Sequence, residues 1–247
     1  MKVRNILFKW MLLAFSITTS TAIYAQDTMN TGQMLSVQQQ SIIGIAALTG
    51  KGDLEKLKSE LNAGLDAGLT VNQIKETLMH VYAYAGFPRS LRGLQTFMTV
   101  LDERKAKGIE DVMGADASPI TDERSKYERG KAILEELTGV PEAGPKTGYA
   151  AFAPTIEIFL KEHLFADIFE RDVLTYQERE LVTISVLSSI GGVEPMLRSH
   201  LNLSLNVGLT PDQLQQFVSV IKQAVGKKEA KAAQQVLDEV LNTNPSN

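Results

Sequence analysis

Apolar residues recur through most of the chain at the three- and four-residue spacing of an amphipathic helix, and no long stretch alternates with a period of two. Four of the apolar runs open with a capping box, in which a Ser or Thr is followed three residues later by Gln or Glu. Ser36, Thr70, Thr175 and Thr210 begin these runs. The pattern therefore predicts an all-α fold in which glycine and proline mark the helix ends.

The spacing and the breaks together predict where each helix lies. Residues 109–121 hold Gly114, Ser118 and Pro119, which predicts a linker, and residues 139–145 predict a loop. The expected helices cover residues 36–49, 53–67, 70–85, 89–107, 121–137, 154–169, 175–190, 195–206, 210–225 and 227–241.

The second half of the chain repeats the first. Residues 62–74 read Asn-Ala-Gly-Leu-Asp-Ala-Gly-Leu-Thr-Val-Asn-Gln-Ile, and residues 202–214 read Asn-Leu-Ser-Leu-Asn-Val-Gly-Leu-Thr-Pro-Asp-Gln-Leu. Glycines recur with the same offset, as helix ends with positive φ require; the pairs are Gly52 with Gly192, Gly68 with Gly208 and Gly86 with Gly226. We therefore predict two tandem helical repeats packed as one unit, at 26–110 and 125–247, with a linker at 111–124. The second repeat includes its own N-terminal helices.

Residues 1–25 have the composition of a secretory signal peptide. The basic residues Lys2, Arg4 and Lys9 precede a short apolar core, which is too short to span a bilayer. We expect cleavage before Gln26, which would make the mature protein periplasmic or secreted.

Composition excludes several classes of function. A net charge of -4 with no Lys/Arg cluster argues against nucleic acid as a partner, and it gives no reason to expect a membrane partner after signal cleavage. The chain has no cysteine, so disulfides, thiolate metal sites and thiol nucleophiles are excluded. The three histidines lack metal-ligand spacing and there is no Gly-rich phosphate loop, so we expect neither a metal nor another cofactor.

Three stretches carry a family resemblance. They are Glu180-Leu-Val-Thr-Ile-Ser-Val-Leu187, the run Leu197-Arg-Ser-His200 followed by Gly208-Leu-Thr210, and Tyr82-Ala-Tyr-Ala-Gly-Phe-Pro-Arg89. In these runs and in the order of its helices, the chain resembles the carboxymuconolactone decarboxylase family, a relative of the alkylhydroperoxidase-D-like proteins. The resemblance covers roughly residues 36–100 and 125–240. It implies an all-helical homo-oligomer, with trimeric or hexameric symmetry, whose substrate is a small organic acid or lactone.

One departure from the wider family bears directly on function. Its peroxidase branch carries a Cys-x-x-Cys pair shortly before the helix histidine, where this chain has Val193-Glu-Pro-Met196. A thiol peroxidase mechanism is therefore chemically unavailable. The decarboxylase branch needs no cofactor, and its chemistry asks for a cation to place the substrate, a donor for the developing oxyanion and an acid to protonate carbon.

The two repeats retain different halves of the family's polar set. The second repeat supplies His200 and Arg198, whose counterparts in the first are Glu60 and Lys58. The first supplies four further polar side chains, Glu76, His80, Tyr82 and Arg89. At the positions of Glu76, His80 and Tyr82, the second repeat has Gln216, Val220 and Lys222. We therefore predict one composite site rather than two equal sites. The bland alternative is that both repeats have drifted and no catalysis remains.

Helical spacing adds detail to this prediction. Glu76 and His80 are four residues apart and share a face, whereas Arg198 and His200 are two apart and cannot both face one pocket wall directly. Either of the latter two could instead face a neighbouring subunit. We interpret Glu180 as a first-turn residue favoured by the helix dipole, rather than as a buried base, and His163 as structural.

The sequence thus favours an exported, cofactor-independent enzyme of the carboxymuconolactone decarboxylase type, acting on a small carboxylated lactone or a related organic acid by acid/base chemistry. The first alternative is a non-catalytic oligomeric module that binds small molecules in the same helical pocket. The second is the peroxidase or antioxidant activity of the wider family, which the absence of cysteine opposes.

Overall fold

The computed structural model describes residues 34–243, so the predicted signal segment 1–25 lies outside the described residues. Within 34–243, all regular secondary structure is helical. The all-α prediction is therefore confirmed for this part of the chain. No helix within it is both long and apolar enough to cross a membrane.

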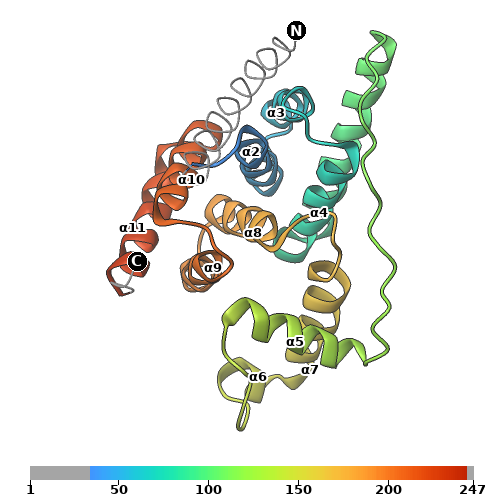
Figure 1. The fold of residues 1–247 in the computed structure, drawn as a ribbon. Helices are drawn as coiled ribbons and strands as arrows, with labels where there is room; N and C mark the ends of the chain where they lie inside the picture. The colour runs from blue at the N-terminus through green and yellow to red at the C-terminus, as the bar shows by residue number, and fades with distance from the viewer. Residues whose placement is uncertain (1–33, 244–247) are drawn as a thin grey trace, which may run out of the picture. The chain divides into compact units, whose positions relative to one another are not determined.

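The first repeat consists of α2 (Val37–Lys51), α3 (Leu54–Asp66) and α4 (Val71–Ala106) (Figure 1). The capping boxes predicted at the starts of α2 and α4 are both formed. The two helices predicted on either side of Gly86 are the two halves of α4, which is kinked where Gly86 has a φ of 76°. Pro88 follows the kink at a position where a first helical turn tolerates it.

The second repeat follows the same plan with α8 (Tyr176–Ile190), α9 (Glu194–Asn206), α10 (Pro211–Ala224) and α11 (Lys227–Thr243). The loop after α8 is one residue longer than the loop after α2. The separation in sequence between matching positions is therefore one residue smaller for α2 and α8 than for the later helices of the repeats. Thr175 accordingly matches Ser36 as the helix cap.

Helices α2 and α8 lie side by side at the centre, and the other helices of both repeats surround them (Figure 1). Both are buried on every side, from Ser41 to Gly50 and from Arg179 to Ser189. Their side chains cross between the repeats, because Ile43 of α2 lies in the core of the second repeat and Val186 of α8 in that of the first. The repeats thus share one core, and neither central helix could be buried without the other.

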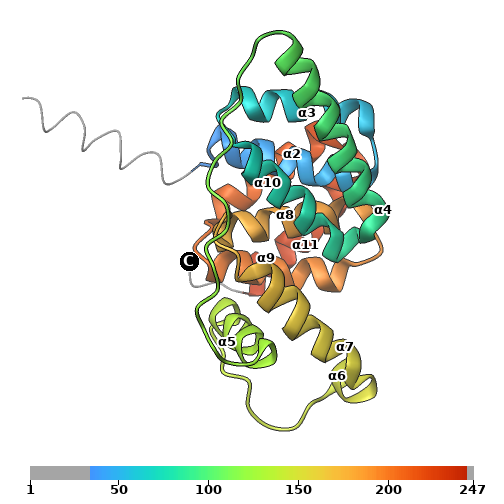
Figure 2. The same ribbon diagram turned by 90° about the vertical axis from the view of Figure 1, so that its right-hand side faces the viewer.

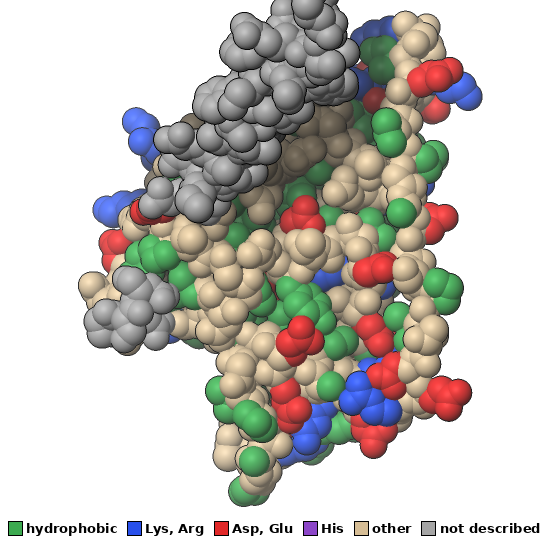
Figure 3. Space-filling view, viewed as in Figure 1, with side chains coloured by type: hydrophobic (Ala, Val, Ile, Leu, Met, Phe, Trp, Pro, Cys, Tyr) green, Lys and Arg blue, Asp and Glu red, His purple; other side chains and the backbone are tan. Residues whose placement is uncertain are grey.

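An additional lobe precedes the second repeat. It consists of α5 (Lys126–Thr138), α6 (Gly148–Phe152), α7 (Pro154–Phe159) and the π-helix η1 (Leu160–Phe169). Helix α5 packs along η1, and a Cβ at Gly130 would lie 1.8 Å from the carbonyl oxygen of Lys161, so only glycine allows this approach. Charged side chains of both signs gather over the lower part of the face shown in Figure 3, where this lobe lies.

Two details of this lobe differ from the prediction. The helix expected from Thr121 begins at Lys126, because Ser125 provides the capping box with Glu128. The expected helix 154–169 changes from α to π hydrogen bonding at Leu160.

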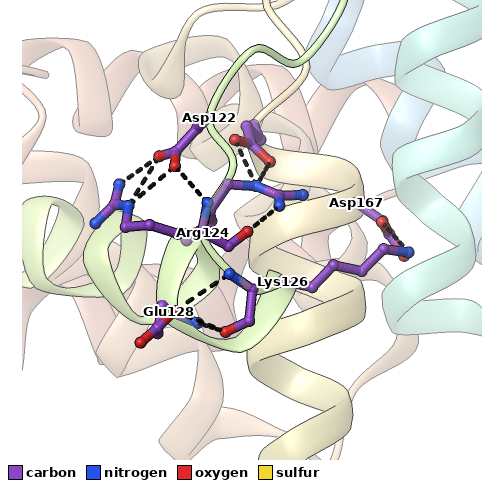
Figure 4. Close-up of polar contacts among 8 residues, drawn as sticks. Asp122, Arg124, Lys126, Glu128 and Asp167 are labelled. Atoms are coloured by element: carbon purple, nitrogen blue, oxygen red, sulfur yellow. Dashed lines mark hydrogen bonds and ion pairs between the residues drawn. The ribbon is translucent and has the colours of Figure 1, made fainter.

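The segment between α4 and α5 runs in an extended path along the body of the repeats (Figure 2). The carbonyls of Val112 and Met113 accept hydrogen bonds of 2.9 Å from the first two backbone N–H groups of α4. At its far end, Lys126 forms an ion pair of 2.8 Å with Asp167 of η1, as Figure 4 shows. The linker therefore caps α4 at one end, and the ion pair where it enters α5 joins two elements of the lobe.

The shared core makes a prediction about stability. Ile43→Ala should lower the free energy of unfolding by about 2–5 kcal/mol, because the fully buried side chain contacts the core of the other repeat. Urea unfolding measures the loss, with Val37→Ala, exposed at the start of the same helix, as the control expected to stay within about 0.5 kcal/mol. Equal effects of the two substitutions would contradict the shared core.

Candidate active site

A buried ion pair joins the two repeats. Arg179 of α8 has no exposed surface, and its Nη2 donates a hydrogen bond of 2.8 Å to Oε1 of Glu76 on α4. Arg171, which follows η1, donates from Nε to both oxygens of the same carboxylate, at 2.9 and 3.1 Å. Two guanidinium groups thus compensate one buried carboxylate, as charges removed from water require.

The same arginine orients His80, which is also fully buried. Arg179 Nη1 donates to His80 Nδ1 at 3.2 Å, and His80 Nε2 lies 2.9 Å from the Thr183 hydroxyl, which itself donates to the Arg179 carbonyl. Nδ1 therefore accepts, and the imidazole proton resides on Nε2. Burial, then the charges of Arg179 and His200, hold the pKa of His80 well below its usual value, so this imidazole is neutral at physiological pH.

His200 of α9 forms the second histidine contact. Its Nδ1 lies 2.8 Å from Oε2 of Glu180, and the carboxylate is fully buried while the imidazole keeps 14% of its surface exposed. The interpretation of Glu180 as a first-turn residue was wrong: it lies beyond the first turn of α8 and points into the core. A histidine bonded to a buried carboxylate is an arrangement that can hold and transfer a proton.

Tyr84 lies between the two histidines and was not predicted. Its ring centroid is 5.6 Å from that of His80, in a stacked geometry, and 5.6 Å from that of His200, edge to face. The signal was available, because Glu76, His80 and Tyr84 recur every four residues along one face of α4. Burial and the nearby Glu180 carboxylate raise the pKa of Tyr84, so its phenol stays protonated.

The structure does not bring the whole predicted set together. Arg198 forms an ion pair with Glu239 on the outer side of α9, and Tyr82 stacks on Phe87, with its hydroxyl 3.1 Å from Nε2 of His163. In the single chain these side chains have no contact with the histidine cluster, and their catalytic roles remain predictions. As spacing predicted, Arg198 and His200 point in different directions.

An open cleft of about 510 Å³ lies beside the cluster, at the C-terminal ends of α2 and α8. Tyr84 and Arg89 line it, together with Gly50, Lys51, Ala85, Ser189 and Ile190. Lys51 is paired with Glu229 at 2.6 Å, whereas Arg89 forms no ion pair within residues 34–243. A Cβ on Gly52 would lie 1.6 Å from Nη1 of Arg89, so the glycine leaves room for this guanidinium. No group of three or more potential metal ligands occurs in the described part of the chain.

The equivalent place in the other half of the molecule has a different chemistry. When the helices of the two repeats are matched, the position of Arg179 is taken by Gln40. Those of Glu76 and His80 are taken by Gln216 and Val220, respectively. Both glutamines bond to the backbone of Leu35, at 3.0 and 2.7 Å, and so hold the start of α2. The ion pair and the buried histidine therefore exist in one half only.

Glu60 stands where the second repeat has His200. Its side chain packs over Gly44, where a Cβ would lie 2.7 Å from the carboxyl group, and it has no hydrogen bond or ion pair to residues 34–243. Burial raises the pKa of Glu60. Burial without a partner disfavours the ionised form of this carboxyl group relative to the same group in water.

This raised pKa makes a prediction about pH. The folded state holds the Glu60 proton more tightly than the unfolded state, so this stabilisation is present at low pH and is lost as pH rises through the raised pKa. Glu60→Gln carries no charge and should gain in Tm over the parent protein as pH rises from about 4 to 7. Thermal unfolding across that range measures the gain. If the Tm of Glu60→Gln instead fell relative to that of the parent protein as pH rises, the raised pKa of Glu60 would be contradicted.

Comparison with known proteins places the chain among its relatives. The Carboxymuconolactone decarboxylase family matches residues 19–97 and 154–239. A curated 4-carboxymuconolactone decarboxylase from Acinetobacter baylyi is 26% identical over 120 residues, which are 48% of this chain and 89% of that protein. Residues 98–153, which include the C-terminal end of α4, the linker, α5 and α6, fall between the two matched regions.

Proposed function

The chain belongs to the carboxymuconolactone decarboxylase family and carries its domain twice, and on that premise we propose that it is a cofactor-independent carboxy-lyase. The substrate is a small carboxylated lactone or a related organic acid. The observation that carries the proposal is the Glu180–His200 pair, which adjoins a neutral histidine and a protonated tyrosine in one buried cluster.

The cluster has the groups that decarboxylation needs. When the bond between the carboxylate and the ring carbon breaks, carbon dioxide leaves and the electron pair remains as a delocalised enolate. His200, held by Glu180, is the acid that gives a proton to the enolate carbon, and solvent returns the proton to the imidazole. Tyr84 is the nearby neutral donor suited to the developing oxyanion. Each step balances without a metal or redox partner.

Arg89 is the group best suited to place an anionic substrate. A guanidinium can hold a carboxylate with two parallel hydrogen bonds, and Arg89 lines the cleft without a competing carboxylate. The cleft volume of about 510 Å³ falls in the range of small-molecule sites. Tyr84, Ala85 and Ile190 give the same cleft an apolar surface for a ring.

One observation favours the alternative of a non-catalytic binding module. Tyr84 is the only residue of the histidine cluster that also lines the cleft in the described part of the chain, so a ligand held there is separated from both histidines. The peroxidase alternative lacks a thiol. Export to the periplasm or medium, signal cleavage after residue 25 and assembly into a trimer or hexamer-like oligomer are further parts of the proposal.

The proposal is tested with carboxyl-labelled lactones, starting with 4-carboxymuconolactone, and release of labelled carbon dioxide as the readout. Once a substrate is found, His200→Ala should lower kcat by about 10²–10⁴-fold, because the acid that protonates carbon is removed.

His163→Ala is the matched control, since this exposed histidine lies on η1 outside the cluster, and it should leave turnover unchanged. Unchanged turnover in His200→Ala would remove the proposed acid. Binding of the lactones without release of carbon dioxide would favour the binding module.

A further inference from the structure

Tyr84 is the point at which the cleft and the histidine cluster meet. One side of the residue lines the cleft, and its ring lies against both His80 and His200. The same ring packs against all three hydrophobic clusters of the described chain, so it closes the space between the repeats and the lobe. Within the described chain, Tyr84 is therefore the residue through which the cleft adjoins both histidines.

The hydroxyl of Tyr84 does little to hold the ring there. It is buried and makes no direct hydrogen bond within the described residues. Burial and Glu180, with one unpartnered oxygen of its own, raise the pKa of Tyr84, whereas the nearby Thr183 hydroxyl, which is engaged with His80 and the Arg179 carbonyl, lowers it. Buried hydroxyl groups are nearly always bonded, because they lose their bonds to water on burial. The observed position of the Tyr84 ring therefore includes the unfavourable free energy of a buried, unbonded hydroxyl group. Movement of the phenol toward the open cleft would return that hydroxyl to water.

The backbone beside Tyr84 is suited to such a movement. Gly86, two residues later, has non-helical dihedral angles, and the helix resumes only after this break. Tyr84 and Ala85 thus end the first half of α4, and a kinked helix end yields more easily than a continuous helix. The packing of the ring opposes opening, and the unpaired hydroxyl favours it.

We propose that Tyr84 is a gate, whose ring turns aside to join the Arg89 cleft to the Glu180–His200 pair. The inference rests on the proposed function for its purpose, because the gate regulates access to that same site. It also explains how a chain with a cleft and a separate histidine cluster can act on one substrate. The test below needs no substrate, so the gate and the carboxy-lyase activity can fail independently.

The experiment measures how often His80 becomes accessible. The purified mature protein is treated with diethyl pyrocarbonate at neutral pH, and modification of each of the three histidines is followed by peptide mass spectrometry. Tyr84→Phe removes the unpaired hydroxyl, so the gate should stay closed for longer and His80 should react about tenfold more slowly. Tyr84→Ala removes the gate, and His80 should react at least about tenfold faster than in the parent protein.

Exposed His163 is the internal reference and should react at one rate in all variants. Tyr149→Phe, at an exposed tyrosine of α6, is the matched control and should leave His80 unaffected. Should Tyr84→Ala fail to fold by circular dichroism, Tyr84→Phe decides alone. Slower His80 modification in the Phe variant supports the gate, and an unchanged or faster rate overturns it.

Discussion

The structure depends on one buried ion pair between the repeats. The guanidinium of Arg179 has no exposed surface, and the Glu76 carboxylate, which it bonds at 2.8 Å, is 2% exposed. A charge this deep is tolerated only when it is paired and hydrogen-bonded, so α4 of one repeat and α8 of the other must meet in a fixed register. That register places His80 on the second guanidinium nitrogen, where the imidazole becomes a neutral group with its proton on Nε2.

The duplication explains why there is one such site. The core needs both central helices, so a shared fold is kept by both repeats, whereas the polar positions have diverged independently. Where the ion pair would recur, Gln40 and Gln216 hold the backbone of Leu35, and Glu60 stands at the position of His200. One half of the molecule thus carries the polar chemistry, and the equivalent half secures the start of α2.

Sequence reasoning succeeded where local rules decide the structure. Capping boxes at Ser36 and Thr70 and the glycine at 86 placed the first repeat, and the four-residue spacing of Glu76 and His80 correctly predicted a common face. It failed for Arg179 and Glu180, because α8 is buried all round and has no polar face to show which residues point into a site. The contacts of Arg198 and the change to π hydrogen bonding at Leu160 depend on packing between distant segments, which spacing does not encode.

The central claim is that Arg179 of one repeat holds His80 of the other as a neutral imidazole with a defined tautomer. Long-range ¹H–¹⁵N NMR of ¹⁵N-histidine-labelled protein, recorded from about pH 5.5 to 8, tests it most directly. The account predicts a His80 signal that keeps the neutral pattern with the proton on Nε2 throughout. A His80 ring that becomes protonated with a midpoint near the ordinary histidine value, or that carries its proton on Nδ1, would contradict it.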